Sequence, residues 1–183
     1  LSSDNVLALE NLPQKVLIVG SGAIGIEWAR IFSNFGVEVH IVELAEHLIP
    51  LADIEVSKRI ERIFKQNKIT FYTNSKIKSI EDKKVILDSG NIIEPDFILS
   101  AVGRVPLERD VPFRRSHTLV DARGEIQLAH YATHQAINLV ESRELSLNKE
   151  LVPSIIYGEP EIAWFGIREQ ECQDDVKKVA LPI

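Results

Sequence analysis

The chain contains one cysteine, Cys172, and no methionine. A single thiol cannot form a disulfide within the chain, so nothing points to an oxidising compartment and the cytoplasm is favoured. Without a partner thiol, Cys172 is expected to be an inert packing or surface residue. A natural chain of 183 residues usually contains several methionines, so either the chain is a piece of a longer protein or residues are missing from the sequence.

Long apolar runs and an excess of positive charge are also missing. No stretch approaches the roughly 20 apolar residues that a membrane-spanning helix needs. The first residues, Leu1-Ser2-Ser3-Asp4, lack the basic and apolar regions of a signal peptide. The 21 basic and 27 acidic residues give a net charge of −6, which does not attract nucleic acid or anionic lipid in general. We therefore expect neither nucleic acid nor a membrane as a partner.

The order of the apolar residues predicts an α/β fold. Hydrophobic residues make up 45% of the chain, enough for a substantial core. Short apolar runs alternate with segments of helical spacing, as in a parallel sheet with helical crossovers. The expected elements are strands at 15–19, 37–42, 69–72 and 97–102, helices at 24–35 and 53–67, and short strands at 76–80, 85–87 and 92–93. Residues 1–14 are expected to form a lead-in loop, and Asp53 can cap the second helix. A further helical run is expected at 126–140 and strand-like pieces at 152–165. The prediction is a Rossmann-like parallel sheet with a β-meander crossover.

A glycine-rich turn lies between the first strand and the first helix. Its sequence, Gly20-Ser21-Gly22-Ala23-Ile24-Gly25, is a G-x-G-x-x-G motif in the context that gives the motif meaning. Gly20 permits the tight turn, Gly22 lets the backbone approach a pyrophosphate, and Gly25 lets the helix pack close to the strand. The unpaired N–H groups and the dipole of the helix start favour an anion there. A glycine-rich turn without a ligand is the alternative, and the strand–turn–helix context favours a dinucleotide site.

Glu43 ends the second strand, 18 residues after Gly25. A carboxylate at this point can accept hydrogen bonds from the adenosine ribose hydroxyls, and it would repel a 2′-phosphate. No arginine or lysine lies between Glu43 and Asp53 to reverse that preference. The sequence therefore predicts NAD rather than NADP, against the alternative of a solvated carboxylate at a strand end.

Three stretches resemble the dihydrolipoamide dehydrogenases of the pyridine nucleotide–disulfide oxidoreductase family. They are VLIVGSGAIGIEWARIFSNFGVEVHIVE at 16–43, AVGRVP at 101–106 and VPSIIYGEPEIAWFG at 152–166. The resemblance implies the NAD(H)-binding domain of a flavin-dependent enzyme, which passes electrons from dihydrolipoamide through a disulfide and FAD to NAD. It also implies a homodimer, within a 2-oxo acid dehydrogenase or glycine cleavage complex.

The resemblance implies further cofactor contacts. Ile24 would lie near the site where nicotinamide stacks on the flavin, and Glu27 would approach the nicotinamide carboxamide. Ile77 and Gly103 would line the adenine-ribose side of the pocket. Val102 is also expected to bind the cofactor. From the residues alone, Ile24 is a core residue, Glu27 a surface charge on a helix and Ile77 an ordinary strand residue.

The resemblance divides the chain into three parts. Residues 1–104 are the NAD-binding domain, 105–150 a partial FAD-domain segment or joint, and 151–183 the truncated start of an interface (dimerisation) domain. The family has more residues between Arg104 and Ile126 than this chain, so either the sequence is shortened there or the chain is a domain piece with a short joint.

The residues that carry the family's redox chemistry are not in this sequence. It lacks the pair of redox cysteines. It also lacks the His-Glu pair that acts as acid–base catalyst late in the family's interface domain. No catalytic residue is therefore assigned, and the chain alone is expected to be inactive. His130 and His134 have a spacing that can bind a metal, but no third ligand is evident, and no metal is assigned. Two alternatives stay open: a stand-alone NAD-binding module without redox chemistry, and another disulfide reductase or NADH oxidase of the superfamily.

Overall fold

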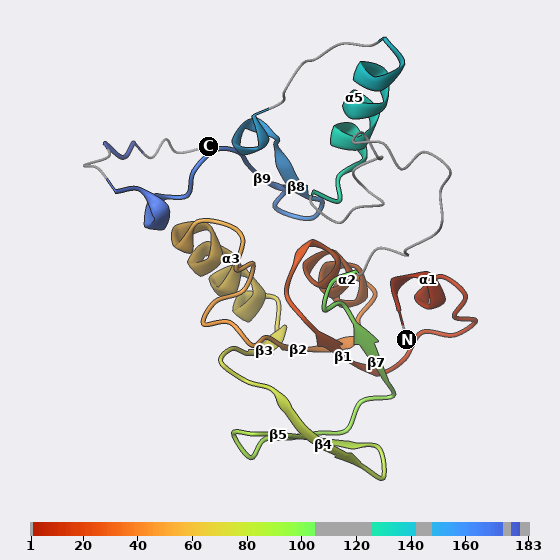
Figure 1. Cartoon of the computed structure of the whole chain (residues 1–183). Helices are drawn as coiled ribbons and strands as arrows, with labels where there is room; N and C mark the ends of the chain where they lie inside the picture. The colour runs from red at the N-terminus through yellow and green to blue at the C-terminus, as the bar shows by residue number, and fades with distance from the viewer. Residues whose placement is uncertain (1, 105–125, 142–147, 174–176, 180–183) are drawn as a thin grey trace. The chain divides into compact units, whose positions relative to one another are not determined.

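The computed structural model describes residues 2–104, 126–141, 148–173 and 177–179. The chain forms two compact units. Figure 1 shows their helices and strands, coloured along the chain. One unit contains Leu1–Val102, Ile155–Ala163 and Ile167–Ile183, and the other contains Gly103–Ser154 and Trp164–Gly166. The expected site lies almost entirely in the first unit.

The first unit is built on a parallel four-stranded sheet in the order β3-β2-β1-β7. The strands are β1 (Lys15–Val19), β2 (Glu38–Val42), β3 (Thr70–Tyr72) and β7 (Phe97–Ser100). β1 is paired on both sides, and Val16, Leu17 and Ile18 are fully buried. An uninterrupted apolar run suits this central position, since both faces of the strand are covered. The predicted parallel sheet is confirmed.

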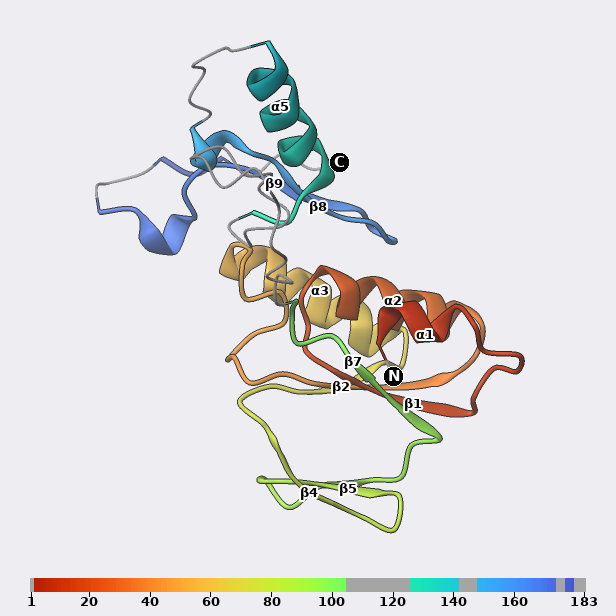
Figure 2. The same cartoon turned by 45° about the vertical axis from the view of Figure 1, so that its right-hand side comes forward.

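Two helices cover one face of this sheet, α2 (Ala23–Asn34) and α3 (Ile54–Gln66) (Figure 2). The apolar spacing of α2 points Ala29 and Phe32 inward, and Phe32 meets Phe97 of β7 edge-on at 5.7 Å between ring centroids. In α3, Ile60 and Phe64 are buried on one stripe. Both helices form because each has one apolar face to bury against the strands.

The other face is covered by a small antiparallel sheet in the order β4-β5-β6. Its strands are β4 (Ile77–Glu81), β5 (Lys84–Leu87) and β6 (Ile92–Ile93). Val85, Leu87 and Ile93 pack into one buried cluster with Leu17 and Val42 of the parallel sheet. The predicted β-meander is therefore the second cover of the sheet, opposite the helices.

Two local details differ from the sequence-based expectation. A short helix α1 (Ser3–Val6) replaces part of the expected lead-in loop, where the side chain of Asn5 accepts from the Ser2 N–H at 3.1 Å. Asp53 precedes α3 as expected, but its side chain does not cap that helix. Asp53 Oδ1 instead accepts a hydrogen bond from the Glu169 N–H at 2.7 Å.

The remaining elements are short. The expected helical run after residue 126 begins at Ala129, as α5 (Ala129–Val140), and the strand-like pieces near the end form a two-stranded sheet of β8 (Ser154–Ile156) and β9 (Ile162–Trp164). Two 3-10 turns, η1 (Lys149–Leu151) and η2 (Glu169–Glu171), complete the elements described. In the described part of the chain, no helix is long and apolar enough to cross a membrane.

Candidate functional site

The segments that follow the strands meet at one edge of the parallel sheet. Val19, at the end of β1, is in register with Val42 of β2 and Ser100 of β7. The chain stays paired just beyond these ends, because the Gly20 N–H donates to Val42 O at 2.9 Å and the Glu43 N–H to Tyr72 O at 2.9 Å. Ligands of open α/β sheets bind at the carboxyl ends of parallel strands, so this edge is the candidate site.

Two glycines of the turn are required by packing. Gly20 has φ +97°, and a Cβ there would lie 2.5 Å from the carbonyl oxygen of Ala101, which follows β7. A Cβ on Gly25 would overlap the carbonyl oxygen of Gly20. These close approaches let the turn lie against β7 and let α2 start directly beside β1. The packing roles expected for Gly20 and Gly25 agree with this geometry.

Gly22 is different, because its surroundings are empty. A Cβ on Gly22 would meet nothing within 4 Å, and its φ of −68° suits any residue. Gly22 immediately precedes α2, whose first N–H groups have no partners within the helix. An open space bounded by N–H donors and the positive end of a helix dipole fits a phosphate group. The fold itself therefore gives no reason for glycine at this position, whereas a bound pyrophosphate would.

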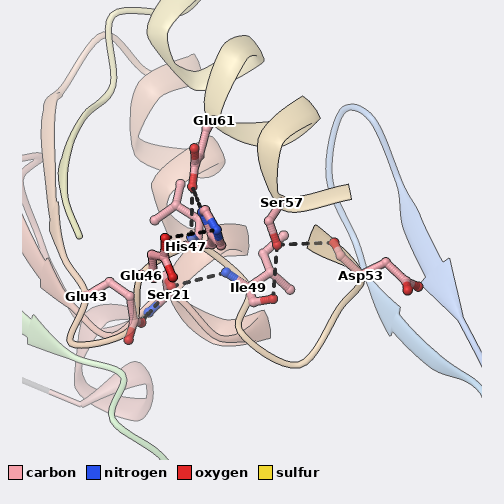
Figure 3. A network of polar contacts seen from close by, with 9 residues as sticks. Ser21, Glu43, Glu46, His47, Ile49, Asp53, Ser57 and Glu61 are labelled. Carbon is pink, nitrogen blue, oxygen red and sulfur yellow. Dashed lines mark hydrogen bonds and ion pairs between the residues drawn. The ribbon is translucent and has the colours of Figure 1, made fainter. Parts of the chain in front are cut away.

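Glu43 lies against this turn and is only 8% exposed. Its Oε2 accepts from the Ser21 N–H at 2.8 Å and from the Ser21 hydroxyl at 2.6 Å (Figure 3). Its Oε1 accepts from the Ala45 N–H at 2.8 Å. The alternative of a solvated carboxylate is wrong, since three donors satisfy a buried one. The carboxylate expected at the ribose thus lies beside the turn expected at the pyrophosphate.

The other expected cofactor residues are more scattered. Ala23 and Ile24 form the first turn of α2, and Ile77 packs at the edge of the buried cluster around Leu17. Val102 is 71% exposed, and Gly103 has φ +105°. Their contacts with a cofactor stay predictions.

Glu27 lies on α2, and its Oε1 accepts from the Tyr157 N–H at 2.9 Å. A role at the nicotinamide stays a prediction for this side chain too. Its present hydrogen bond is to the turn after β8, a contact that its position in the sequence did not suggest.

Two residues of the site were missed by the sequence analysis. Ser21 occupies a variable position of the motif, yet it is fully buried and its hydroxyl contacts both Glu43 and Ile49. Ile49 has φ +54°, which is unusual for a β-branched residue. No local pattern signals either feature, because both depend on contacts between segments distant in the chain.

The histidines of α5 and the thiol of Cys172 were the remaining candidate groups in the sequence. Within the described residues, no group of three or more His, Cys, Asp or Glu side chains could hold a metal ion. In α5, His134 Nδ1 lies 3.2 Å from Asn138 Nδ2. The Cys172 thiol is half-buried, and it donates to the carbonyl oxygen of Arg168 at 3.4 Å.

Known proteins with similar sequences share one family. The family described as "Pyridine nucleotide-disulphide oxidoreductase" matches residues 1–138. A dihydrolipoyl dehydrogenase of Bacillus subtilis is 33% identical over 208 residues, covering 94% of this chain and 44% of that protein. A dihydrolipoamide dehydrogenase of Chaetomium thermophilum is 29% identical over 218 residues, covering all of this chain and 42% of that protein.

Solved structures show the same fold. LpdA from Mycobacterium tuberculosis has a TM-score of 0.78 at 22% identity, covering 93% of this chain and 44% of that chain. The flavoprotein disulfide reductase RclA from Escherichia coli also has a TM-score of 0.78 at 22% identity, covering 93% of this chain and 46% of that chain.

The chain is shorter than its relatives in two respects. It spans less than half the length of the two curated relatives. The Chaetomium thermophilum alignment also runs over 218 positions against the 183 residues of this chain, so 35 positions have no counterpart here. The stretch that is expected to be short, 105–125, lies outside the described residues, so its shortening stays a prediction. Because the family match spans residues 1–138, with both the glycine turn and Glu43, the chain belongs to the pyridine nucleotide–disulphide oxidoreductase family.

Proposed function

We propose that residues 1–104 are the NAD(H)-binding domain of a flavin-dependent dihydrolipoamide dehydrogenase. The family's enzymes are oxidoreductases that use FAD and a pyridine nucleotide, and the curated relatives described above carry this name. The observation that supports NAD binding best is the open space at Gly22, at the N-terminus of α2 and beside the buried carboxylate of Glu43.

The chain's own residues would bind the dinucleotide in two places. The pyrophosphate would lie over Gly22, Ala23 and Ile24, where it accepts hydrogen bonds from backbone N–H groups at the start of α2. The adenosine ribose would lie at Glu43. By the resemblance to the family, Ile77 and Gly103 would line the adenine-ribose side of the pocket, and Val102 would also contact the cofactor. FAD, held mainly by parts of the protein outside this chain, would relay electrons between a disulfide and the nicotinamide.

Replacing Glu43 by alanine is expected to weaken NAD binding about tenfold or more, because a hydrogen bond to a charged group contributes about 1.5–3 kcal/mol. Calorimetric titration of the 183-residue chain with NAD and with NADP measures this, and the unchanged chain is expected to prefer NAD. The matched control is Glu46→Gln, since Glu46 is an exposed carboxylate of the same loop. Tighter binding of NADP than of NAD by the unchanged chain would contradict the assignment.

The isolated chain is expected to purify colourless and to show no reduction of lipoamide by NADH. It contains neither a pair of cysteines nor the late His-Glu pair that the family's chemistry needs. Absorbance between 350 and 500 nm tests the first expectation, and NADH consumption with lipoamide tests the second. A yellow protein with nearly one flavin per chain would show that the FAD site is largely present here.

We infer the organisation of the full-length protein from the same relatives. Residues 105–150 would belong to the FAD domain or a joint, and 151–183 would begin an interface domain that forms a homodimer. The complete enzyme would act in the cytoplasm on dihydrolipoamide, within a 2-oxo acid dehydrogenase or glycine cleavage complex. Size measurement of the full-length protein tests the homodimer, and a monomer would contradict it.

A further inference from the structure

Ser21 joins three segments of the chain at one buried point. Its side chain is fully buried, and its hydroxyl donates to Glu43 Oε2 at 2.6 Å. The same hydroxyl accepts from the Ile49 N–H at 3.2 Å, and the Ser21 carbonyl oxygen accepts from that N–H at the same distance. Ser21 thus connects the glycine turn, the end of β2 and the loop before α3 (Figure 3).

Ile49 is held in a conformation that it would not adopt alone. Its φ of +54° lies in the left-handed region, which is disfavoured for β-branched residues. Its carbonyl oxygen accepts from the Ala52 N–H at 2.9 Å and from the Ser57 hydroxyl at 3.4 Å, and its side chain is 1% exposed. Strained residues persist where their surroundings over-determine them, and Ser21 supplies both contacts on the N–H side.

The hydrogen bonds of Glu43 leave its carboxylate only one way to meet a ligand. An ionised carboxylate has about four acceptor positions. Oε2 uses two for Ser21, and Oε1 uses one for the Ala45 N–H. Among the described residues no further donor to Glu43 is found, so Oε1 keeps one acceptor position. The Ser21 hydroxyl therefore occupies the second acceptor position of Oε2, and Oε1 is left as the available oxygen.

We propose that Ser21 is a positioning residue for dinucleotide selection, which holds the Glu43 carboxylate with Oε1 towards the ribose and fixes the Ile49 loop beside it. The proposal rests on the proposed NAD-binding function. A carboxylate fixed in this way accepts a ribose hydroxyl without rearranging, and it cannot turn away from a 2′-phosphate. Selection between NAD and NADP thus depends on a serine hydroxyl whose hydrogen bonds go to Glu43 and Ile49.

The test compares Ser21→Ala with Ser57→Ala in the 183-residue chain. Ser57 is also a buried serine bonded to Ile49, but it has no hydrogen bond to Glu43. Calorimetric titration gives the Kd for NAD and for NADP, and thermal denaturation gives the stability of each variant. Ser21→Ala keeps the backbone N–H to Glu43, so the change reports on the hydroxyl alone.

Ser21→Ala is expected to reduce the ratio of the NADP Kd to the NAD Kd about tenfold, the effect of one hydrogen bond to a charged group. Ser57→Ala is expected to lower Tm and leave the ratio unchanged. If Ser21→Ala does not fold, Ser21→Cys replaces the hydroxyl with a weak donor of similar size and is expected to reduce the ratio as well.

An unchanged ratio, with both dinucleotides weakened equally, would show that Ser21 is only structural and overturn the proposal. If Ser57→Ala reduces the ratio of the NADP Kd to the NAD Kd as much as Ser21→Ala does, the proposal is also overturned. General loosening of the loop would then be the cause. Failure of the unchanged chain to bind NAD would instead refute the proposed function itself, and the two failures are therefore distinguishable.

Discussion

Replacing Gly22 by alanine is expected to abolish detectable NAD binding and to leave the fold intact. The added methyl group meets no protein atom within 4 Å, and the backbone φ of −68° is ordinary for alanine. The space that the methyl group enters is the one proposed for the pyrophosphate, which needs the backbone at contact distance. Calorimetric titration with NAD measures the binding, and thermal denaturation by circular dichroism measures the fold.

The control for this variant is Gly158→Ala. A Cβ on Gly158 would make only ordinary contacts, with Pro160 O at 3.7 Å and the Arg30 side chain at 3.8 Å. Both substitutions should leave Tm within a few degrees of the unchanged chain, and only Gly22→Ala should lose NAD. Normal binding by Gly22→Ala would mean that the phosphate does not lie over this turn.

The same change at Gly25 is expected to disrupt the fold rather than the binding surface. A Cβ there would overlap the carbonyl oxygen of Gly20 and lie 3.0 Å from its carbonyl carbon. Both are backbone atoms, so the start of α2 would have to move away from β1. Overpacking of a tight site costs about 1–3 kcal/mol, and a backbone collision belongs at the upper end or beyond. We expect Tm to fall by on the order of 10 °C.

Thermal denaturation of Gly25→Ala beside Gly22→Ala checks this difference directly. Both variants add one methyl group to the same turn, so a general effect of replacing glycine by alanine would appear in both. If Gly25→Ala has the same Tm as the unchanged chain, α2 does not approach the turn as closely as it does in the structure. The pair separates the glycine that packing requires from the glycine that a ligand requires.

The sequence by itself determined the main strands and helices and the edge of the sheet at which the candidate site lies. The unbroken apolar run of β1 predicted a buried parallel strand, since only a strand covered on both faces tolerates it. The glycines follow that strand and Glu43 follows the next one, so the sequence predicted that they lie together at one edge of the sheet. These signals are local, because they depend on the spacing of side chains within a few residues along the chain. The resemblance to the family rested on three stretches, two of them within residues 1–138, and the match over those residues confirmed the family.

The tertiary structure alone decided how the site is held. Ser21 and Glu43 are 22 positions apart, and Ser21 and Ile49 are 28 positions apart. Their contact depends on the parallel pairing of β1 with β2 and on the path of the loop before α3. Asp53 shows the same limit, since its expected capping bond gave way to the Glu169 N–H, 116 positions away. Residue spacing predicts a helix or a strand. It does not identify the residue that a side chain contacts once distant segments pack together.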